Sequence, residues 1–348
     1  MKHRIAFFGF GGMAKWHYER ITKRDDLELA GIWDIRECRR ELAAEMGIHV
    51  YKSQEDLLAD ETVDLVLIAT PNDVHKPLAI AAMEAGKNVV TEKPVTLSSQ
   101  DLQEMIDASE RTGKVFTVHQ NRRWDQDFNT VKKILKEVDI GEIHKIESRI
   151  HGSRGIPGDW RQLPEKGGGM VLDWGVHLLD QLLLFYPDAK IKSVHAIVTN
   201  VTNQLVDDGF TVTLMFDNGV TMVCEVGTSN FISLPRFYVL GANGTAIIEE
   251  WTQPAKIVSA TGVDEKDVVP VVTAAGLTKT MAPRRPECLS TQEIGPVVCD
   301  VSEFYTNVLA AIEGREELIV QMPQVMRVMR LMEAVFRSAE LNQVVDFE

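Results

Sequence analysis

The chain has 348 residues, 45% of them hydrophobic and 25% charged, values that are ordinary for a globular protein and exclude a disordered or fibrous chain. Its formal net charge of −14 opposes nucleic-acid binding, so we expect no nucleic-acid partner. The four cysteines lack CxxC spacing, no apolar run is long enough to span a membrane, and the N-terminus leaves no room for a signal peptide. We therefore expect a cytoplasmic protein of about two domains, with no metal site and no membrane partner.

Strand-like and helix-like segments alternate through the first third of the chain. The predicted strands are 5–8, 27–33, 63–69, 88–91 and 115–118. The predicted helices between them are 13–24, 36–46, 77–85 and 98–113. Such alternation is typical of right-handed βαβ units, and it predicts an α/β fold whose N-terminal part is a doubly wound, parallel Rossmann sheet.

The pattern changes after residue 122. We predict helices at 128–138, 170–186, 301–313 and 322–341, and strands at 143–150, 191–199, 210–216, 220–226, 237–240 and 245–250. Residues 152–169 form a glycine-rich loop, and residues 252–295 are predicted to be irregular. The consecutive strands in this second part imply hairpins, so we place a domain boundary after residue 122. Residues 1–122, with the alternating pattern, are the expected dinucleotide-binding domain. A substrate-binding and oligomerisation domain follows at 123–348, of α+β type with a large, mostly antiparallel open sheet.

A glycine turn follows the first predicted strand. Gly9-Phe10-Gly11-Gly12-Met13-Ala14 fits the pattern G-x-G-x-x-A between a strand and a helix. Gly9 permits the tight turn, Gly11 lets the backbone approach a pyrophosphate, and the small Ala14 allows close packing of helix and strand. The free N–H groups of the helix N-terminus would then face the phosphates.

An acidic residue follows at the spacing that dinucleotide binding requires. Asp34 ends the second predicted strand, 20 residues after Ala14, where a carboxylate accepts hydrogen bonds from a ribose diol. Its negative charge favours NAD, because it repels the 2′-phosphate of NADP. Arg36 and Arg39 lie close enough to bind that phosphate, so NADP remains possible.

Two further segments follow the ends of neighbouring predicted strands. Ala69-Thr70-Pro71-Asn72-Asp73-Val74-His75 follows one strand, and Glu92-Lys93-Pro94 follows the next. Loops at the carboxyl edge of a parallel sheet line its ligand crevice, where the Lys93 amine would reach a substrate hydroxyl. An ordinary Pro-Asn turn and a solvated lysine are the alternative interpretations.

An acid–imidazole pair lies on the predicted helix at 170–186. Asp173 and His177 are four residues apart and share one helix face, with Asp180 near His177. A carboxylate one turn from an imidazole orients it and supports its positive charge. A helix with one polar face is the alternative interpretation.

Together these residues resemble the Gfo/Idh/MocA family of NAD(P)-dependent sugar and cyclitol oxidoreductases. The motifs are the glycine turn, ATPNDVH at 69–75, GKNVVTEKP at 86–94 and GGGMVLDWGVH at 167–177, and the last segment of the chain resembles the closing helix of the family. HQNRRWD at 119–125 resembles the branches that oxidise inositols and glycosides, which implies a polyhydroxylated ring as substrate.

The resemblance implies a site in which Lys93 and His177 flank the reacting hydroxyl group. We predict His177 as the base, Lys93 as its electrostatic partner, and Asp173 as a group that binds substrate or supports the base. The cofactor contacts that we predict are Gly9, Gly11, Gly12, Met13, Ala14, Asp34, Ile35, Arg36, Thr70, Pro71, Asn72, His75, Glu92, Lys93 and Asn121. The substrate contacts that we predict are Lys93, Arg123, Trp124, Arg154, Trp160, Arg161, Asp173 and His177.

The resulting hypothesis is an oxidoreductase that transfers hydride between a secondary alcohol of a sugar, cyclitol or glycoside and NAD(P). Two alternatives remain at this point: a redox-assisted glycosidase or lyase that recycles bound NAD, and an NAD-sensing sugar-binding protein without catalysis. The strands at 191–250 offer a broad face for self-association, so we expect a homo-oligomer, either a dimer or a tetramer.

Overall fold

The N-terminal sheet of the computed structural model, which describes residues 2–262 and 268–348, is parallel and five-stranded. Its strands lie in the order β2-β1-β3-β4-β5 and comprise β1 (His3–Phe8), β2 (Leu27–Trp33), β3 (Leu65–Ile68), β4 (Asn88–Thr91) and β5 (Phe116–Val118). The associated helices are α1 (Gly12–Ile21), α2 (Glu37–Glu45), α3 (Gln54–Ala59), α4 (His75–Glu84) and α5 (Ser99–Thr112). The doubly wound sheet is confirmed, and it places a ligand crevice at the carboxyl ends of β1 and β3, where the strand order reverses.

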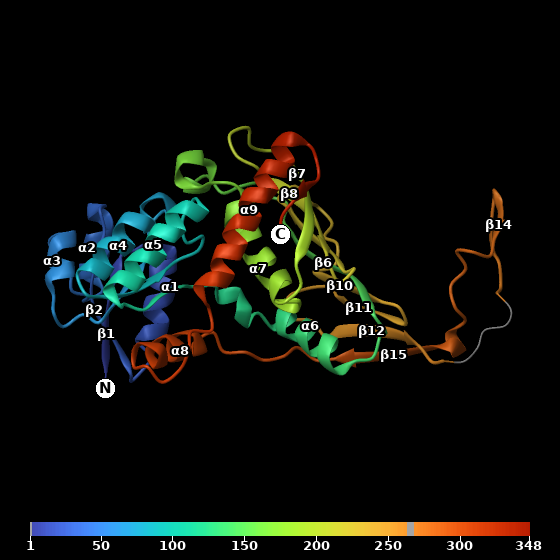
Figure 1. The fold of residues 1–348 in the computed structure, drawn as a ribbon, viewed down its shortest axis with the longest axis horizontal. Coiled ribbons are helices and arrows are strands. Elements are labelled where there is room, and N and C mark those ends of the chain that lie inside the picture. Colours follow the sequence, from blue (N-terminus) through green and yellow to red (C-terminus); the bar gives the residue numbers. More distant parts are fainter. Residues whose placement is uncertain (1, 263–267) are drawn as a thin grey trace.

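The second sheet has nine strands in the order β15-β12-β11-β10-β6-β9-β8-β7-β16. Only the β6–β9 pair is parallel in this sheet, which confirms a mostly antiparallel arrangement. Its strands are β6 (Ile143–His151), β7 (Ile191–Thr199), β8 (Gly209–Phe216), β9 (Thr221–Gly227), β10 (Phe237–Gly241), β11 (Gly244–Ile248), β12 (Ala255–Ala260), β15 (Leu289–Ile294) and β16 (Val345–Asp346). The helices α6 (Gln126–Glu137), α7 (Val176–Phe185) and α9 (Met322–Leu341) lie on the side of this sheet that faces the N-terminal domain (Figure 1).

The prediction that residues 252–295 are irregular is wrong where this range forms strands, and residues 263–267 of the range lie outside the described residues. Strands β12 and β15 extend the large sheet, while β13 (Val271–Thr273) and β14 (Gly276–Thr278) form a separate hairpin. Every residue of β15 is at least partly exposed, so its sequence lacks the alternation of buried and exposed positions that marks a half-buried strand. Helix α3 and the short strand β16 were not predicted either.

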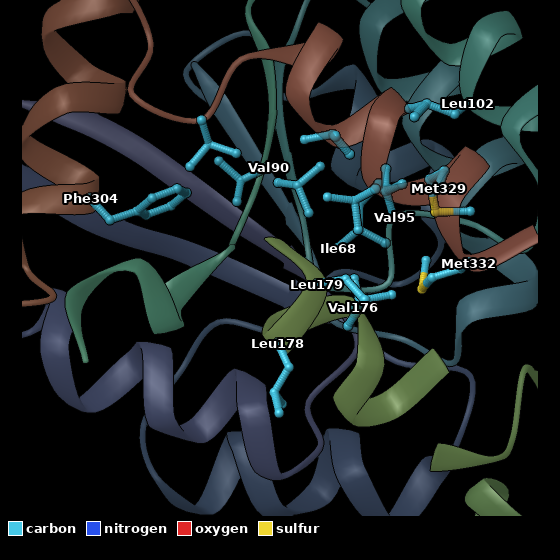
Figure 2. Packing of buried hydrophobic residues seen from close by; sticks show 14 of the residues in the cluster. Ile68, Val90, Val95, Leu102, Val176, Leu178, Leu179, Phe304, Met329 and Met332 are labelled. Carbon is cyan, nitrogen blue, oxygen red and sulfur yellow. The ribbon is translucent and has the colours of Figure 1, made fainter. Parts of the chain in front are cut away.

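The chain returns to the first domain near its end. Helix α8 (Glu303–Ile312) places the Tyr305 hydroxyl 2.5 Å from Nδ1 of His17 on α1, and the Phe304 ring contacts the His119 ring. Figure 2 shows Phe304 in one apolar cluster with Val90 of β4 and Leu179 of α7. The division into domains at residues 122 and 123 therefore stays a prediction, because residues 303–312 pack against the N-terminal domain.

A buried ion pair joins the segment after β5 to α7 and α9. Arg123 donates to both carboxylate oxygens of Asp180 on α7, at 2.8 and 2.6 Å. Its remaining terminal nitrogen, Nη1, donates to the carbonyl of Ile319 and to the side chain of Gln324. The bidentate geometry satisfies both charges inside the protein, which is the condition under which a buried pair is tolerated.

Replacing either partner of this pair should destabilise the fold strongly. We expect Arg123→Ala and Asp180→Ala each to lower the free energy of unfolding by about 3–5 kcal/mol, because each leaves an uncompensated buried charge. The losses should not add in the double variant, since both variants remove the same interaction. Urea unfolding followed by circular dichroism measures them.

Arg111→Ala is the matched control, because Arg111 pairs with Glu84 while both side chains are more than half exposed. Its effect should stay below about 1 kcal/mol. A loss of similar size in the control and in Arg123→Ala would contradict the structural role of the buried pair.

Candidate active site

The glycine turn after β1 opens toward a cleft between the two domains. Gly9 has φ +88°, and a Cβ there would lie 2.7 Å from the Ala69 carbonyl oxygen, so only glycine fits. A Cβ on Gly11 or Gly12 would meet nothing within 4 Å. Helix α1 begins at Gly12, so its first N–H groups face this open space and suit a pyrophosphate.

Asp34 fixes the glycine turn from the end of β2. Its Oδ2 atom accepts a hydrogen bond from the Phe10 N–H at 2.7 Å, and its Oδ1 atom accepts one from the Arg36 N–H at 2.8 Å. Each carboxylate oxygen keeps a second lone pair, which leaves capacity for a ribose hydroxyl. The turn and the carboxylate are therefore held together and fit a dinucleotide.

The cleft beside the turn has a volume of about 450 Å³. Most of the predicted cofactor contacts line it, together with three of the predicted substrate contacts that come from the second domain. The lining residues are Gly11, Gly12, Met13, Arg36, Arg39, Ala69, Thr70, Pro71, Asn72, Glu92, Lys93, Asp159, Trp160, Arg161 and Asp173. The structure thus brings the glycine turn, Lys93 and Asp173 to one cavity.

Lys93 and Asp173 form an ion pair across the two domains. The Lys93 amine donates to the Oδ1 atom of Asp173 at 2.9 Å and to the Asp173 carbonyl at 2.8 Å. The second carboxylate oxygen, Oδ2, accepts from Nε of Arg161 at 2.9 Å. Asp173 therefore holds one cation from each domain at the wall of the cleft.

The charge of Asp173 is maintained by these two cations. Burial would raise the pKa of this carboxyl, but Lys93 and Arg161 outweigh the burial and hold the pKa below its usual value. Asp173 is thus an anion at neutral pH, and both of its oxygens are already bonded. This arrangement makes it a group that positions Lys93.

His177 lies one turn beyond Asp173. The prediction of one regular helix from residue 170 is wrong, because residues Val171–Gly175 form a wider π-helical turn before α7 begins. The His177 side chain is buried, and its Nδ1 atom has no hydrogen-bond partner among the residues that the structure describes. Burial, followed by the charges of Lys93 and Arg122, holds its pKa well below the usual value, so the imidazole is neutral.

A buried network lies behind Lys93. Oε1 of Glu92 contacts Nε2 of His17 at 2.7 Å and Nδ1 of His119 at 2.9 Å. The other oxygen of Glu92 accepts the Lys93 N–H at 3.2 Å. Burial holds the pKa of His17 at about 4, so this imidazole is neutral and donates to Glu92.

These three side chains also have the composition of a metal site. Tetrahedral zinc with bonds of about 2.0 Å separates its ligand atoms by roughly 3.3 Å. Here both histidine nitrogens lie within 2.9 Å of one carboxylate oxygen, which is the spacing of hydrogen bonds. We therefore assign the cluster as a hydrogen-bonded network that fixes the backbone of Lys93.

Several predicted contacts lie elsewhere. The His75 ring is buried between the carbonyls of Pro94 and Thr70, so it fixes the loops rather than a ligand. Arg123 is committed to Asp180, away from the cleft. The residues that also do not line the cleft are Gly9, Ala14, Asp34, Ile35, Asn121, Trp124, Arg154 and His177.

Asn72 and Trp124 are predicted ligand contacts whose side chains bond to other parts of the protein. Asn72 borders the cleft, but its amide donates to the carbonyls of Lys166 and Gly167 and thereby holds the glycine-rich loop. Trp124 and Asn121 border a different cavity of about 270 Å³, and Nε1 of Trp124 donates to Glu303. Arg154 is exposed on the loop between β6 and α7.

An aromatic stack near His177 was missed. The Arg122 guanidinium lies 4.3 Å from the ring centre of Trp174 and 4.8 Å from that of Trp251. The Trp174 ring lies 5.9 Å from the His177 ring. Arg122 and Arg123 are neighbours in the sequence, and only the geometry of the turn decides which of the two arginines faces the tryptophan rings. Trp251 lies in no recognisable motif, so the sequence did not indicate its place near the site.

No helix in the described part of the chain has both the length and the apolar character needed to cross a lipid bilayer.

Comparisons with known proteins agree with this geometry. Residues 3–120 match the family profile described as an oxidoreductase family with an NAD-binding Rossmann fold, and residues 128–247 match the GFO/IDH/MocA C-terminal domain. A crystal structure of an NAD-binding protein from Listeria innocua is 48% identical, with a TM-score of 0.95, over 99% of both chains.

Two curated relatives carry assigned activities. Myo-inositol 2-dehydrogenase from Thermotoga maritima is 31% identical over 51% of this chain and 53% of its own. D-glucoside 3-dehydrogenase from Escherichia coli is 30% identical over 56% of each chain. The chain thus aligns with about half the length of these relatives. With both family profiles matched in order, the chain belongs to the Gfo/Idh/MocA family of oxidoreductases, which use NAD(P) as cofactor.

Proposed function

We propose that the protein is an NAD(P)-dependent dehydrogenase that oxidises a secondary alcohol of a sugar, cyclitol or glycoside. The observation that carries the proposal is the Lys93–Asp173 ion pair at the wall of the cleft, one helical turn from the neutral imidazole of His177. The names of the two curated relatives, an inositol dehydrogenase and a glucoside dehydrogenase, support a polyhydroxylated ring as substrate.

The cleft suits a nicotinamide dinucleotide. Gly11 and Gly12 would present backbone N–H groups to the pyrophosphate, and Asp34 would accept hydrogen bonds from the adenosine ribose. When bound, the oxidised nicotinamide supplies the hydride acceptor. Asp34 favours NAD, whereas Arg36 and Arg39, which line the cleft, would accommodate a 2′-phosphate.

His177 and Lys93 share the proton chemistry in this proposal. Oxidation of an alcohol releases the hydroxyl proton, and we assign its acceptance to the neutral His177, whose buried ring lies one turn beyond Asp173 and would have to be reached from the cleft past the Lys93–Asp173 pair. The Lys93 ammonium stabilises the negative charge that develops on the oxygen. Asp173 positions that ammonium through its carboxylate and its carbonyl.

Substrate binding would fall to the second domain. Asp159, Trp160 and Arg161 line the same cleft as the glycine turn, and the Arg161 guanidinium lies 4.6 Å from the Trp160 ring centre. Carboxylates and guanidinium groups bind hydroxyls, and an aromatic face covers the C–H face of a sugar ring. This composition supports a ring that carries several hydroxyl groups.

A homo-oligomer is part of the proposal. Helices α6, α7 and α9 lie on one side of the nine-stranded sheet, and Ile197 of β7 and Met215 of β8 are apolar residues of this sheet that are about half exposed. Such a face is typical of an association surface.

A substrate screen tests the function directly. Inositols, hexoses and glycosides would be offered with NAD and with NADP, and the reduced cofactor would be measured by its absorbance. We expect one mole of reduced cofactor for each mole of ring oxidised. Substrate consumption without reduced cofactor would instead support a glycosidase or lyase that recycles NAD, and binding without turnover would support a sensor.

Removing either proposed catalytic group should abolish most of the turnover. We expect Lys93→Met and His177→Ala each to lower kcat by about 10²-fold or more, the effect of losing a positioned acid–base group. Lys76→Met and His144→Ala are matched controls, since Lys76 lies in surface ion pairs with Asp101 and Glu104 and His144 is exposed on β6. Near-normal turnover in either site variant would remove that residue from the proposed mechanism.

The low pKa of His177 predicts the pH dependence of the reaction. A lowered pKa means that the imidazole stays neutral, and thus able to accept a proton, until the pH falls well below 6.5. We expect kcat/KM to change little between pH 8 and 6.5 and to fall only at lower pH. Circular dichroism at each pH distinguishes protonation of the site from unfolding, and a half-maximal rate at pH 7 in a folded protein would contradict the assignment.

Asp34→Ala should act on the cofactor rather than on the chemistry. We expect weaker NAD binding and less discrimination against NADP, because the ribose acceptor and the charge that repels a 2′-phosphate are both lost. Titration of both cofactors followed by fluorescence measures the two dissociation constants. An unchanged ratio of the constants would argue against the ribose role of Asp34.

A further inference from the structure

We propose that Asp207 is a positioning residue for the reaction, because it holds the start of the helical segment that carries Asp173 and His177. Asp207 lies near the end of the loop between β7 and β8, 36 residues beyond the residue to which its side chain bonds. The inference rests on the proposed function, since it concerns the same site.

The contacts of Asp207 satisfy the first two N–H groups of this segment. Its backbone carbonyl accepts from the Met170 N–H at 3.1 Å, and its Oδ2 atom accepts from the Val171 N–H at 2.8 Å. The first N–H groups of a helix have no partner within the helix, and the side chain of Met170 does not cap them. Asp207 therefore caps the segment from a loop that is distant in the sequence.

The glycine before this segment lets Asp207 come this close. Gly169 has φ +97°, and a Cβ there would collide with the Oδ1 atom of Asp207. The carbonyl of Gly169 accepts from the Asp173 N–H at 3.1 Å. Gly169 thus lies between the capping carboxylate and the backbone of Asp173.

Asp207 is a buried carboxylate whose charge is stabilised by backbone groups. It is 8% exposed, and burial raises the pKa of its carboxyl to about 6, so it is an anion at neutral pH. The groups that oppose the effect of burial include the N–H groups of Val171 and Met170, which carry partial positive charge at the start of a helix. A buried anion held in this way costs stability. The fold thus tolerates a destabilising charge where that charge holds the segment.

The capped segment presents Asp173 to Lys93. Residues Val171–Gly175 form the π-helical turn, a rare form that is frequent at functional sites. The carboxylate and the carbonyl of Asp173 both bond the Lys93 amine, so a shift of this turn would move the amine. Misplacement of a reacting group by about 1 Å lowers a rate by up to about 10²-fold. Loss of the cap should therefore slow the reaction.

Two substitutions at position 207 test the hydrogen bond to the turn. Asp207→Ala removes the acceptor for the Val171 N–H, whereas Asp207→Asn keeps an oxygen there. With NAD and the ring found in the substrate screen, we expect Asp207→Ala to lower kcat about tenfold or more, with the KM for NAD changed less than about twofold. Asp207→Asn should keep at least about half of the wild-type kcat. A folded Asp207→Ala variant with normal kcat, or an Asp207→Asn variant that is equally slow, would overturn the proposal.

Circular dichroism checks that each variant is folded. If Asp207→Ala does not fold, Asp207→Leu takes its place, because leucine has the same branching as aspartate and no acceptor. The expected loss of kcat and the result that would overturn the proposal are the same for this variant.

Ser53→Ala is the matched control. The Ser53 hydroxyl caps α3 by accepting from the Asp56 N–H at 3.1 Å, so this variant loses the same kind of interaction in a helix that does not line the cleft. Its kcat should stay near the wild-type value. An equal loss of kcat in Ser53→Ala would assign the effect to general destabilisation and reject a positioning role for Asp207.

Hydrogen exchange measured by mass spectrometry tests the cap without any substrate. Asp207→Ala should speed exchange in peptides that cover residues 170–177, while Asp207→Asn and Ser53→Ala should leave these peptides unchanged. Unchanged exchange in Asp207→Ala would reject the cap, whatever the activity. A wild type that oxidises no ring would instead refute the proposed function, and the exchange result would still decide whether Asp207 holds the segment.

Discussion

The ion pair between Lys93 and Asp173 is the interaction on which the arrangement of the cleft depends. Lys93 follows β4 of the parallel sheet, and Asp173 lies in the π-helical turn that leads into α7 of the second domain. Because the amine bonds the carboxylate and the carbonyl of one residue, both the side chain and the backbone of that turn are fixed. The position of His177 relative to the glycine turn follows from this contact.

The backbone N–H of Lys93 is held in turn by Glu92, which also contacts two buried histidines. Glu92 lies in a dry environment, yet His119 and His17 hold its pKa well below the usual value against the opposing effect of burial. The negative charge of Glu92 also favours protonation of His177, opposite to the effects of burial, Lys93 and Arg122. The proton affinity of His177 is thus a balance among groups from both domains.

The parts of the structure that follow local rules were predictable from the sequence. Glycine at a turn after a strand, Ser98 as the cap of α5 and Gly113 at its end all reflect backbone chemistry within a few residues. The Asn-Gly pairs at 218–219 and 243–244 are typical hairpin turns, and they join β8 to β9 and β10 to β11, although of these four residues only Gly219 has a positive φ. Long-range strand pairing was not predictable from the sequence. Strand β15 joins the sheet through backbone hydrogen bonds to β12, and its mostly polar side chains give no pattern that indicates this pairing. Likewise, His75 and Arg123 find internal partners that no local pattern encodes.

Helix α8 has a consequence for the evolution and engineering of this fold. The nucleotide-binding half is completed by a segment that lies about 180 residues beyond its last strand in the sequence, since the Tyr305 hydroxyl contacts the His17 imidazole and the Phe304 ring contacts the His119 ring. The two halves are therefore not modules that can be exchanged by a single crossover at the end of the first sheet. A chimera that replaced everything after residue 122 would have to carry a matching α8, or leave the histidines behind Lys93 open to water.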